Sequence, residues 1–255
     1  MQRNAVCWMA MILAGCVLSS AGCQFQGIRS FVRRESGEDH DRPLSNRQVA
    51  DVQLTMARSL EQRGEMEQAL EAYRSAVEKD PRRATGYWRM AILQDRLGKI
   101  EESEAMYREA LKRDAKNPDL LCDYGYSLYL QRRWAESEER LRQAIALKPS
   151  HKRAHNHLGL ILAQAEQSEA ALAEFRKAGC DEAEARSNLG LLMTLNHRWV
   201  EAREQYELAL DADPDSATAQ SGLENLEAVL AKAEPNAGTF RMASFARSAD
   251  GSPEE

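Results

Sequence analysis

Aromatic residues and long single-sign charge runs are scarce in this sequence. Phe, Trp and Tyr together make up 6% of the 255 residues, whereas charged residues make up 29%. So few aromatic side chains argue against a β-sandwich or barrel and favour a helical protein. The net charge is −6 and Lys and Arg form no long run. The chain therefore offers no clustered basic face for nucleic acid phosphates.

Sequence motifs for catalysis and for cofactor binding are missing as well. The five cysteines form no CxxC pair, and the sequence contains no GxGxxG or GxxxxGK[ST] loop, no HExxH and no GxSxG. His151, His155 and His157 are close in sequence, but on one helix His157 would point in a different direction from His155. We expect these histidines to pack or to face solvent. The sequence thus predicts no enzyme, no catalytic residue, no metal, no cofactor and no small-molecule substrate.

The amino terminus has the pattern of an export signal. Arg3 precedes an apolar run of fourteen residues from Ala5 to Leu18. As a helix this run would rise about 21 Å, short of the hydrocarbon core of about 30 Å, so we expect cleavage rather than a membrane span. Residues 13–16, Leu-Ala-Gly-Cys, resemble the lipobox of bacterial lipoproteins, whose cysteine receives diacylglycerol. We predict a signal peptide over residues 1–15 and lipidation of Cys16.

Other interpretations of the amino terminus stay open. Cys23 follows Ser-Ala-Gly, which lacks the aliphatic residue, and its lipidation would extend the signal to residues 1–22. An unmodified secretory signal and an uncleaved apolar anchor are further alternatives. Val17, after Cys16, differs from the aspartate that retains enterobacterial lipoproteins in the inner membrane, which favours the outer membrane of the bacterial cell envelope.

Residues of matched size recur along the remaining chain at a spacing of 34 residues, with one spacing of 31. The recurring small residues are Ala76, Ala110, Ala144, Ala178 and Ala209. Three positions before each stands a large residue, namely Tyr73, Tyr107, Leu141, Phe175 and Tyr206. Pro81, Pro149 and Pro214 follow at positions where a helix should stop. Each copy therefore predicts a helical hairpin, over residues 50–83, 84–117, 118–151, 152–182 and 183–216.

Small residues at the eighth, twentieth and twenty-seventh positions of each copy resemble the tetratricopeptide repeat family. The resemblance implies an all-α solenoid of five helical hairpins over residues 45–232. A polar-backed helix at 217–232 is expected to cap it. Residues 16–44 are interpreted as a flexible tether and 233–255 as a disordered tail. The fourth copy is three residues short, so we expect its second helix or the following turn to be trimmed.

In this family the first helix of each hairpin lines a concave groove that binds a protein or peptide partner. The resemblance implies a groove made of Leu54, Arg58, Trp88, Ile92, Tyr126, Tyr129, Leu130, Leu160, Leu191 and Leu195, with polar flanks at Asp95, Arg96, Arg153 and Gln164. The carboxylate clamp of chaperone-binding members is not matched by Leu54, Arg58, Arg89, Asp119 and Asp123. We expect an amphipathic helix in an apolar groove rather than a chaperone's acidic carboxyl terminus.

The layout of signal, tether and repeats resembles the repeat lipoproteins that help to assemble type IV or tight-adherence pili and secretin channels. The resemblance implies a membrane-anchored adaptor of the cell envelope with a protein partner. Two alternatives stay open: a scaffold for cell-wall enzymes, and an accessory subunit of an enzyme complex or an enzyme that builds its site from the repeats. The partner's identity, the orientation at the membrane and the oligomeric state are left open.

Overall fold

The computed structural model describes residues 43–233 of the chain. The predicted signal peptide, both candidate lipidation cysteines, nearly all of the tether and the tail after residue 233 lie outside the described residues. The described part contains helices and no strand. The helices are α1 (Asn46–Gln62), α2 (Met66–Lys79), α3 (Ala84–Arg96), α4 (Ile100–Arg113), α5 (Pro118–Leu130), α6 (Trp134–Leu147), α7 (Lys152–Gln164), α8 (Ser168–Ala178), α9 (Glu182–Leu195), α10 (Trp199–Ala212) and α11 (Ala217–Ala233). The predicted all-α class is confirmed.

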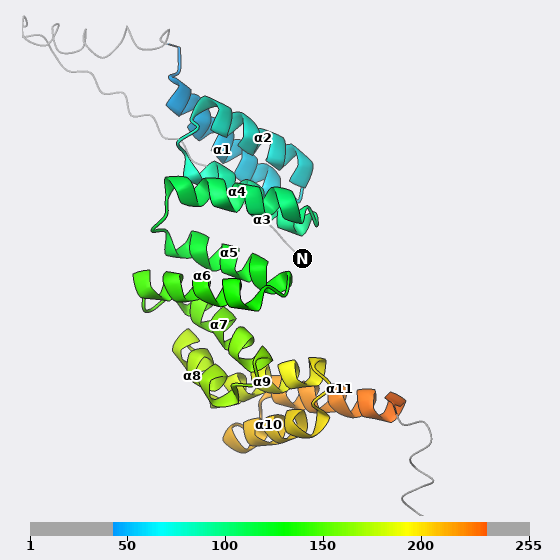
Figure 1. Ribbon diagram of the computed structural model, residues 1–255. Helices are drawn as coiled ribbons and strands as arrows, with labels where there is room; N and C mark the ends of the chain where they lie inside the picture. The colour runs from blue at the N-terminus through cyan, green and yellow to red at the C-terminus, as the bar shows by residue number, and fades with distance from the viewer. Residues whose placement is uncertain (1–42, 234–255) are drawn as a thin grey trace, which may run out of the picture. The chain divides into compact units, whose positions relative to one another are not determined.

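Consecutive helices pair as antiparallel hairpins (Figure 1). The pairs are α1 with α2, α3 with α4, α5 with α6, α7 with α8, and α9 with α10. Each second helix also packs against the first helix of the next hairpin, and α11 packs against α9 and α10. Ala219 and Leu226 of α11 are fully buried, whereas most of its other described side chains are exposed. The prediction of five hairpins followed by one terminal helix is confirmed.

Local sequence signals set several helix starts. Ser45 caps α1 and forms a capping box with Gln48, and Asp181 does the same for α9 with Glu184. The side chain of Asn117 caps α5 by accepting from two backbone N–H groups of the first turn. Such caps satisfy backbone donors that have no partner within the helix. The first helices of these hairpins therefore begin where the local sequence dictates.

The turn inside every hairpin contains a residue in the left-handed region. In the first two hairpins it is glycine, Gly64 with φ 81° and Gly98 with φ 71°. In the other three it is Arg132, Glu166 and His197, each with φ 60°. The left-handed region costs a residue with a Cβ about 1–2 kcal/mol. The same turn geometry is thus kept in all five hairpins even where the sequence lacks glycine.

Small residues in the first helices allow the large residues of the second helices to enter the core. A Cβ added to Gly125 would lie 2.8 Å from Leu141 Cγ, and one added to Gly159 would lie 2.6 Å from Phe175 Cε1. Ala76, Ala110, Ala144 and Ala209 of the second helices are buried as well. These positions stay small because the helices would otherwise be forced apart.

The fourth hairpin departs from the others as its shortened sequence predicts. Helix α8 has 11 residues, against 14 in α2, α4, α6 and α10. It ends at Ala178, and Gly179 follows with φ 102°. Ala178 consequently sits in the last turn and is half-buried, whereas its counterparts have a further three residues of helix behind them. None of the described helices is long and apolar enough to cross a membrane.

Candidate partner-binding site on the first helices

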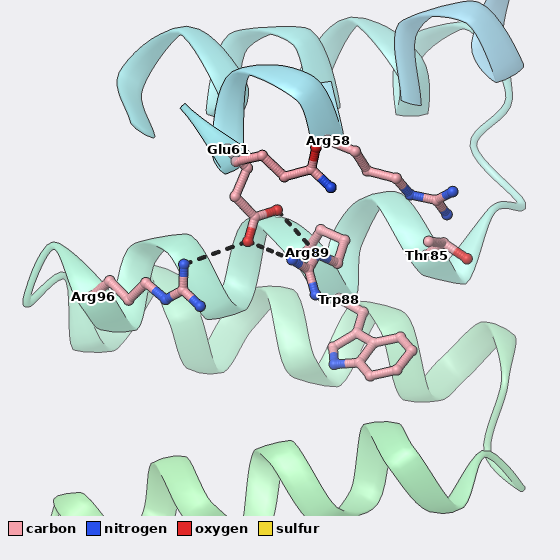
Figure 2. A pocket seen from close by; sticks show the side chains of 7 residues that line it. Arg58, Glu61, Thr85, Trp88, Arg89 and Arg96 are labelled. Carbon is pink, nitrogen blue, oxygen red and sulfur yellow. Dashed lines mark hydrogen bonds and ion pairs between the residues drawn. The ribbon is translucent and has the colours of Figure 1, made fainter. Parts of the chain in front are cut away.

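Two neighbouring pockets open along the first helices of hairpins one to four. One, of about 480 Å³, lies between α1 and α3 and is lined by Arg58, Glu61, Gln62, Thr85, Trp88, Arg89 and Arg96 (Figure 2). The other, of about 320 Å³, is lined by Arg89, Ile92, Asp95, Arg96, Tyr107, Asp123, Tyr126, Leu130 and Arg153. Both pockets share Arg89 and Arg96, so they form one continuous candidate site.

A buried carboxylate organises the first pocket. Glu61 on α1 accepts hydrogen bonds from the guanidinium of Arg89, from Arg96 at 3.5 Å and from the hydroxyl of Tyr73 at 3.0 Å (Figure 2 shows the two arginines). Burial alone would raise the pKa of Glu61, but the hydrogen bond and charge of Arg89, aided by Tyr73 and Arg96, outweigh it and hold that pKa below its ordinary value. Glu61 is therefore ionised at neutral pH.

A second carboxylate connects three first helices. Asp123 on α5 accepts a 3.1 Å hydrogen bond from the indole Nε1 of Trp88 on α3 and a 2.8 Å bond from Arg153 on α7. Arg153 also donates to Asp119 over 3.1 Å. Burial raises the pKa of Asp123, although Arg153 and Trp88 oppose that rise. Asp123 thus holds the indole and the guanidinium in place across successive hairpins.

The other polar residues predicted on the flanks also join neighbouring first helices. Asp95 on α3 accepts from the hydroxyls of Ser103 and, at 3.0 Å, of Ser127 on α5. The side-chain amides of Gln164 on α7 and of Asn196, the residue that follows α9, exchange two hydrogen bonds of 3.3 and 3.1 Å. The Asp95–Ser127 and Gln164–Asn196 bonds link successive hairpins, so these polar residues have a structural role in addition to any contact with a partner.

Aromatic side chains meet at the centre of the site. Tyr126 stacks on the imidazole of His157, with ring centroids 4.4 Å apart, and on Tyr129, with centroids 6.0 Å apart. Tyr129 in turn contacts Trp134 on α6. Burial, together with the charges of Arg153 and His151, lowers the pKa of His157 to about 4. A neutral His157 therefore supports the partly exposed Tyr126 at neutral pH.

The structure distributes the predicted groove residues over three levels of exposure. Arg58, Tyr126, Leu130, Leu191 and Leu195 are exposed, while Trp88, Ile92, Tyr129 and Leu160 are half-buried. The prediction that Leu54 lines the groove is corrected by the structure: this side chain is 4% exposed and belongs to the core cluster that also contains Ala57 and Tyr73. Its Cδ2 would lie 3.8 Å from a Cβ added to Gly86 on α3, an ordinary van der Waals distance, and Val77 of α2 lies nearer to that position. Leu54 therefore packs in the core between α1, α2 and α3.

The pockets bring together only part of the predicted set. Arg58 and Trp88 line the first pocket, and Ile92, Tyr126 and Leu130 line the second, whereas Leu191 and Leu195 on α9 line neither. The sequence did not single out Glu61 as a site residue, although it pairs with Arg89, 28 positions later. Opposite charges spaced about one repeat apart in the sequence could have identified Glu61. Asp119 and Arg153, which are 34 positions apart and hydrogen-bonded, show the same spacing.

His151 and His155, which are close to His157 in the sequence, form hydrogen bonds within the fold. His151 donates from Nε2 to Asp119 and accepts the Ala154 N–H at Nδ1. His155 bonds Glu174 at 2.5 Å and the carbonyl of Pro149 at 2.8 Å. Among residues 43–233 no group of three His, Cys, Asp or Glu side chains is arranged to hold a metal ion.

Comparison with known proteins identifies the family. Residues 54–119, 122–182 and 166–217 match the tetratricopeptide repeat, and the chain belongs to this family. Its sequence is 28% identical over 192 residues to the type IV pilus assembly protein PilF of Pseudomonas aeruginosa, a match that covers 73% of each chain.

Solved structures agree with the fold. The structure of Pseudomonas aeruginosa PilF is 23% identical with a TM-score of 0.56, and the match covers 79% of this chain and 99% of that one. The structure of PilW, described as a widely conserved type IV pilus biogenesis factor, is 19% identical with a TM-score of 0.57, covering 74% and 95% of the two chains. The chain is thus a tetratricopeptide repeat scaffold similar to PilF and PilW.

Proposed function

We propose that this protein is a membrane-anchored, non-enzymatic adaptor of the bacterial cell envelope that acts in the assembly of type IV pili or their secretin channel. The observation that carries the proposal is the similarity to a pilus assembly protein over nearly three quarters of both chains. An export-signal pattern with a lipobox-like string before Cys16 supports an envelope location. A repeat scaffold has no need of a catalytic centre to act in this way.

The adaptor binds a helix or peptide of its partner along the first helices of the hairpins. Tyr126, Leu130, Leu191 and Leu195 expose apolar surface on α5 and α9, with Leu130 59% and Leu195 66% exposed. Exposed apolar side chains rimmed by polar ones typically mark an interaction surface, and an amphipathic helix matches such a surface. Aromatic anchors such as Tyr126 tend to supply much of the binding energy.

Crosslinking and affinity capture from membranes test the adaptor role. Three forms of this chain serve as bait: the wild type, the variant Tyr126→Ala with Leu130→Ala, and a control variant. The control carries Leu147→Ala and Val200→Ala, which change two exposed apolar residues on second helices. We expect pilus or secretin components to be captured by the wild type and the control and lost from the first variant. Capture of peptidoglycan enzymes instead would favour a cell-wall scaffold and contradict the pilus role.

A genetic test complements the capture. Deletion of the gene should abolish surface pili, and complementation should restore them with the control variant but not with the Tyr126 and Leu130 variant. Normal piliation of the deletion strain would contradict the proposal even if a partner is captured.

We place the lipid anchor on Cys16, with Cys23 as the alternative, and the mature protein at the outer membrane. Mass spectrometry of the mature amino terminus identifies the modified cysteine, and fractionation of Cys16→Ser cells tests whether attachment depends on it. Diacylglycerol on Cys23 would move the site by seven residues. An unmodified chain recovered in the soluble fraction would refute the anchor.

A further inference from the structure

The pocket between α1 and α3 differs in chemistry from the apolar surface beside it. We propose that it is a subsite for carboxylate side chains, so that the partner segment carries Asp or Glu next to its apolar residues. This inference rests on the proposed function, namely that a partner peptide binds along the first helices, and it specifies the chemistry of that peptide.

The charges of the pocket favour an anion. It is lined by three arginines and one glutamate, a local charge of 3 − 1 = +2 in a chain whose net charge is −6. Glu61 is bonded chiefly to Arg89, while Arg96 contacts it only at 3.5 Å and keeps a side chain that is 51% exposed. Arg58 is exposed and forms no ion pair with any residue of the described chain. Arg58 and Arg96 therefore have N–H donors available for a carboxylate, which guanidinium groups bind in a bidentate manner.

The pocket is held in place before any ligand binds. The indole of Trp88 is fixed by its hydrogen bond to Asp123. Arg89 is fixed by its hydrogen bonds to Glu61 (Figure 2). Binding to groups that are already ordered loses less conformational entropy. The pocket therefore presents a fixed indole beside two guanidinium groups with free donors.

Continuity with the second pocket defines what the ligand must contain. Arg89 and Arg96 line both pockets, and Ile92, Tyr126 and Leu130 form the apolar side of the second. A carboxylate bound by Arg96 therefore lies beside a site for an apolar side chain.

The basic group differs from the family's carboxylate clamp. Clamp positions hold Leu54, Arg58, Arg89, Asp119 and Asp123 in this chain, so three of the five carry no cationic side chain. The available donors come from Arg58, which is one of these positions, together with Arg96, which is not, because it stands at the thirteenth position of its copy. A peptide carboxylate also suits the overall charge better than a polyanion does. Nucleic acid and anionic lipid surfaces would be repelled by the net charge of −6, whereas a single side chain experiences mainly the local field of the pocket.

A peptide titration tests the carboxylate subsite. The probe is a fluorescein-labelled amphipathic peptide with leucines at i, i+3, i+4 and i+7 and flanking glutamates, and its partner peptide has glutamine at every glutamate. Fluorescence anisotropy gives the Kd of both peptides for the full chain in detergent. The wild type should bind the glutamate peptide about tenfold or more tightly than the glutamine peptide, and added salt should reduce the difference.

Two variants matched in net charge test whether the preference for glutamate depends on the arginines of the pocket. Arg58→Gln with Arg96→Gln should abolish the preference for glutamate. Arg74→Gln with Arg82→Gln, two exposed arginines outside the pocket, should retain it, although both variants change the net charge equally, from −6 to −6 − 2 = −8. Unchanged circular dichroism verifies that both are folded.

The outcomes separate this inference from the proposed function. Equal binding of both peptides to the wild type, or a glutamate preference that survives in the Arg58 and Arg96 variant, would overturn the subsite. If, in that case, the variant Tyr126→Ala with Leu130→Ala loses binding of the peptides, the apolar groove is supported and only the carboxylate subsite is contradicted. Binding of neither peptide would contradict the groove and the subsite together.

Discussion

The indole Nε1 of Trp88 donates a 3.1 Å hydrogen bond to the carboxylate of Asp123, which lies 35 positions later on the first helix of the next hairpin. The same carboxylate accepts from Arg153 on the hairpin after that. One acidic side chain thus links three consecutive repeats through side chains alone. Because each hairpin of a solenoid contacts only its neighbours, such links add to the interface energy between repeats.

Trp88→Phe should destabilise the fold by about 1 kcal/mol. The phenyl ring keeps most of the packing but cannot donate to Asp123, which retains Arg153 as a partner, so only one hydrogen bond is lost. Denaturant unfolding followed by circular dichroism measures the change. Trp199→Phe provides the control, because no hydrogen bond of the Trp199 indole is found within the described chain. An equal loss in both variants would show that packing, and not the bond to Asp123, accounts for the effect.

Gly98→Ala should destabilise by about 1–2 kcal/mol, because alanine resists the φ of 71° in this turn. A Cβ there meets no atom within 4 Å, so the backbone conformation alone causes the loss. Arg132→Gly, at the equivalent turn with φ 60°, should instead stabilise by about 0.5–1 kcal/mol. Urea midpoints of the two variants measure both effects. Opposite signs are the expected result, and a gain in stability for Gly98→Ala would contradict the role of the left-handed turn.

Ala144→Leu should destabilise by about 1–3 kcal/mol, because Ala144 is fully buried and a larger side chain would force helices apart. Ala135→Leu on the same helix provides the control, since Ala135 is exposed. Thermal unfolding compares the two variants with the wild type. An unchanged midpoint for Ala144→Leu would count against the tight helix contact at this position.

Acidification should weaken the wild type more than a His157→Gln variant between about pH 6.5 and pH 4. The unfolded chain takes up a proton near the ordinary histidine pKa of 6.5, whereas burial keeps the folded-state pKa of His157 at about 4. The unfolded state therefore binds more protons in this window, and stability falls as the pH falls. The difference between the two proteins should reach up to about 3 kcal/mol at the acidic end.

Urea unfolding at a series of pH values measures this difference. Carboxylates contribute equally to both proteins and cancel in the comparison. Parallel stability curves for wild type and variant across the window would contradict the depressed pKa of His157.

The helical hairpins could be predicted from the sequence because their determinants are local and periodic. Apolar residues at helical spacing, a 34-residue recurrence of small and large side chains, and proline at helix ends act within one copy or between adjacent copies. Even the trimmed fourth hairpin follows from three missing residues. The position of Tyr126 and Leu130 on the first helix of their hairpin was also predicted, since the repeat register places them there, and both side chains are exposed.

The tertiary structure decided how the side chains on those helices combine. Leu54 occupies a predicted groove position in the register but is buried, because it packs in the core cluster that also contains Tyr73 and Val77 of α2. Arg89 and Arg96 gather around Glu61 because α1 and α3 bring residues from different copies within hydrogen-bonding reach. Hydrogen bonds and ion pairs act over about 3–4 Å, and a repeat register places a side chain on a face without specifying which neighbour it reaches. The sequence by itself therefore determined the scaffold, and only the packing of neighbouring hairpins produced the basic pocket and the polar links between repeats.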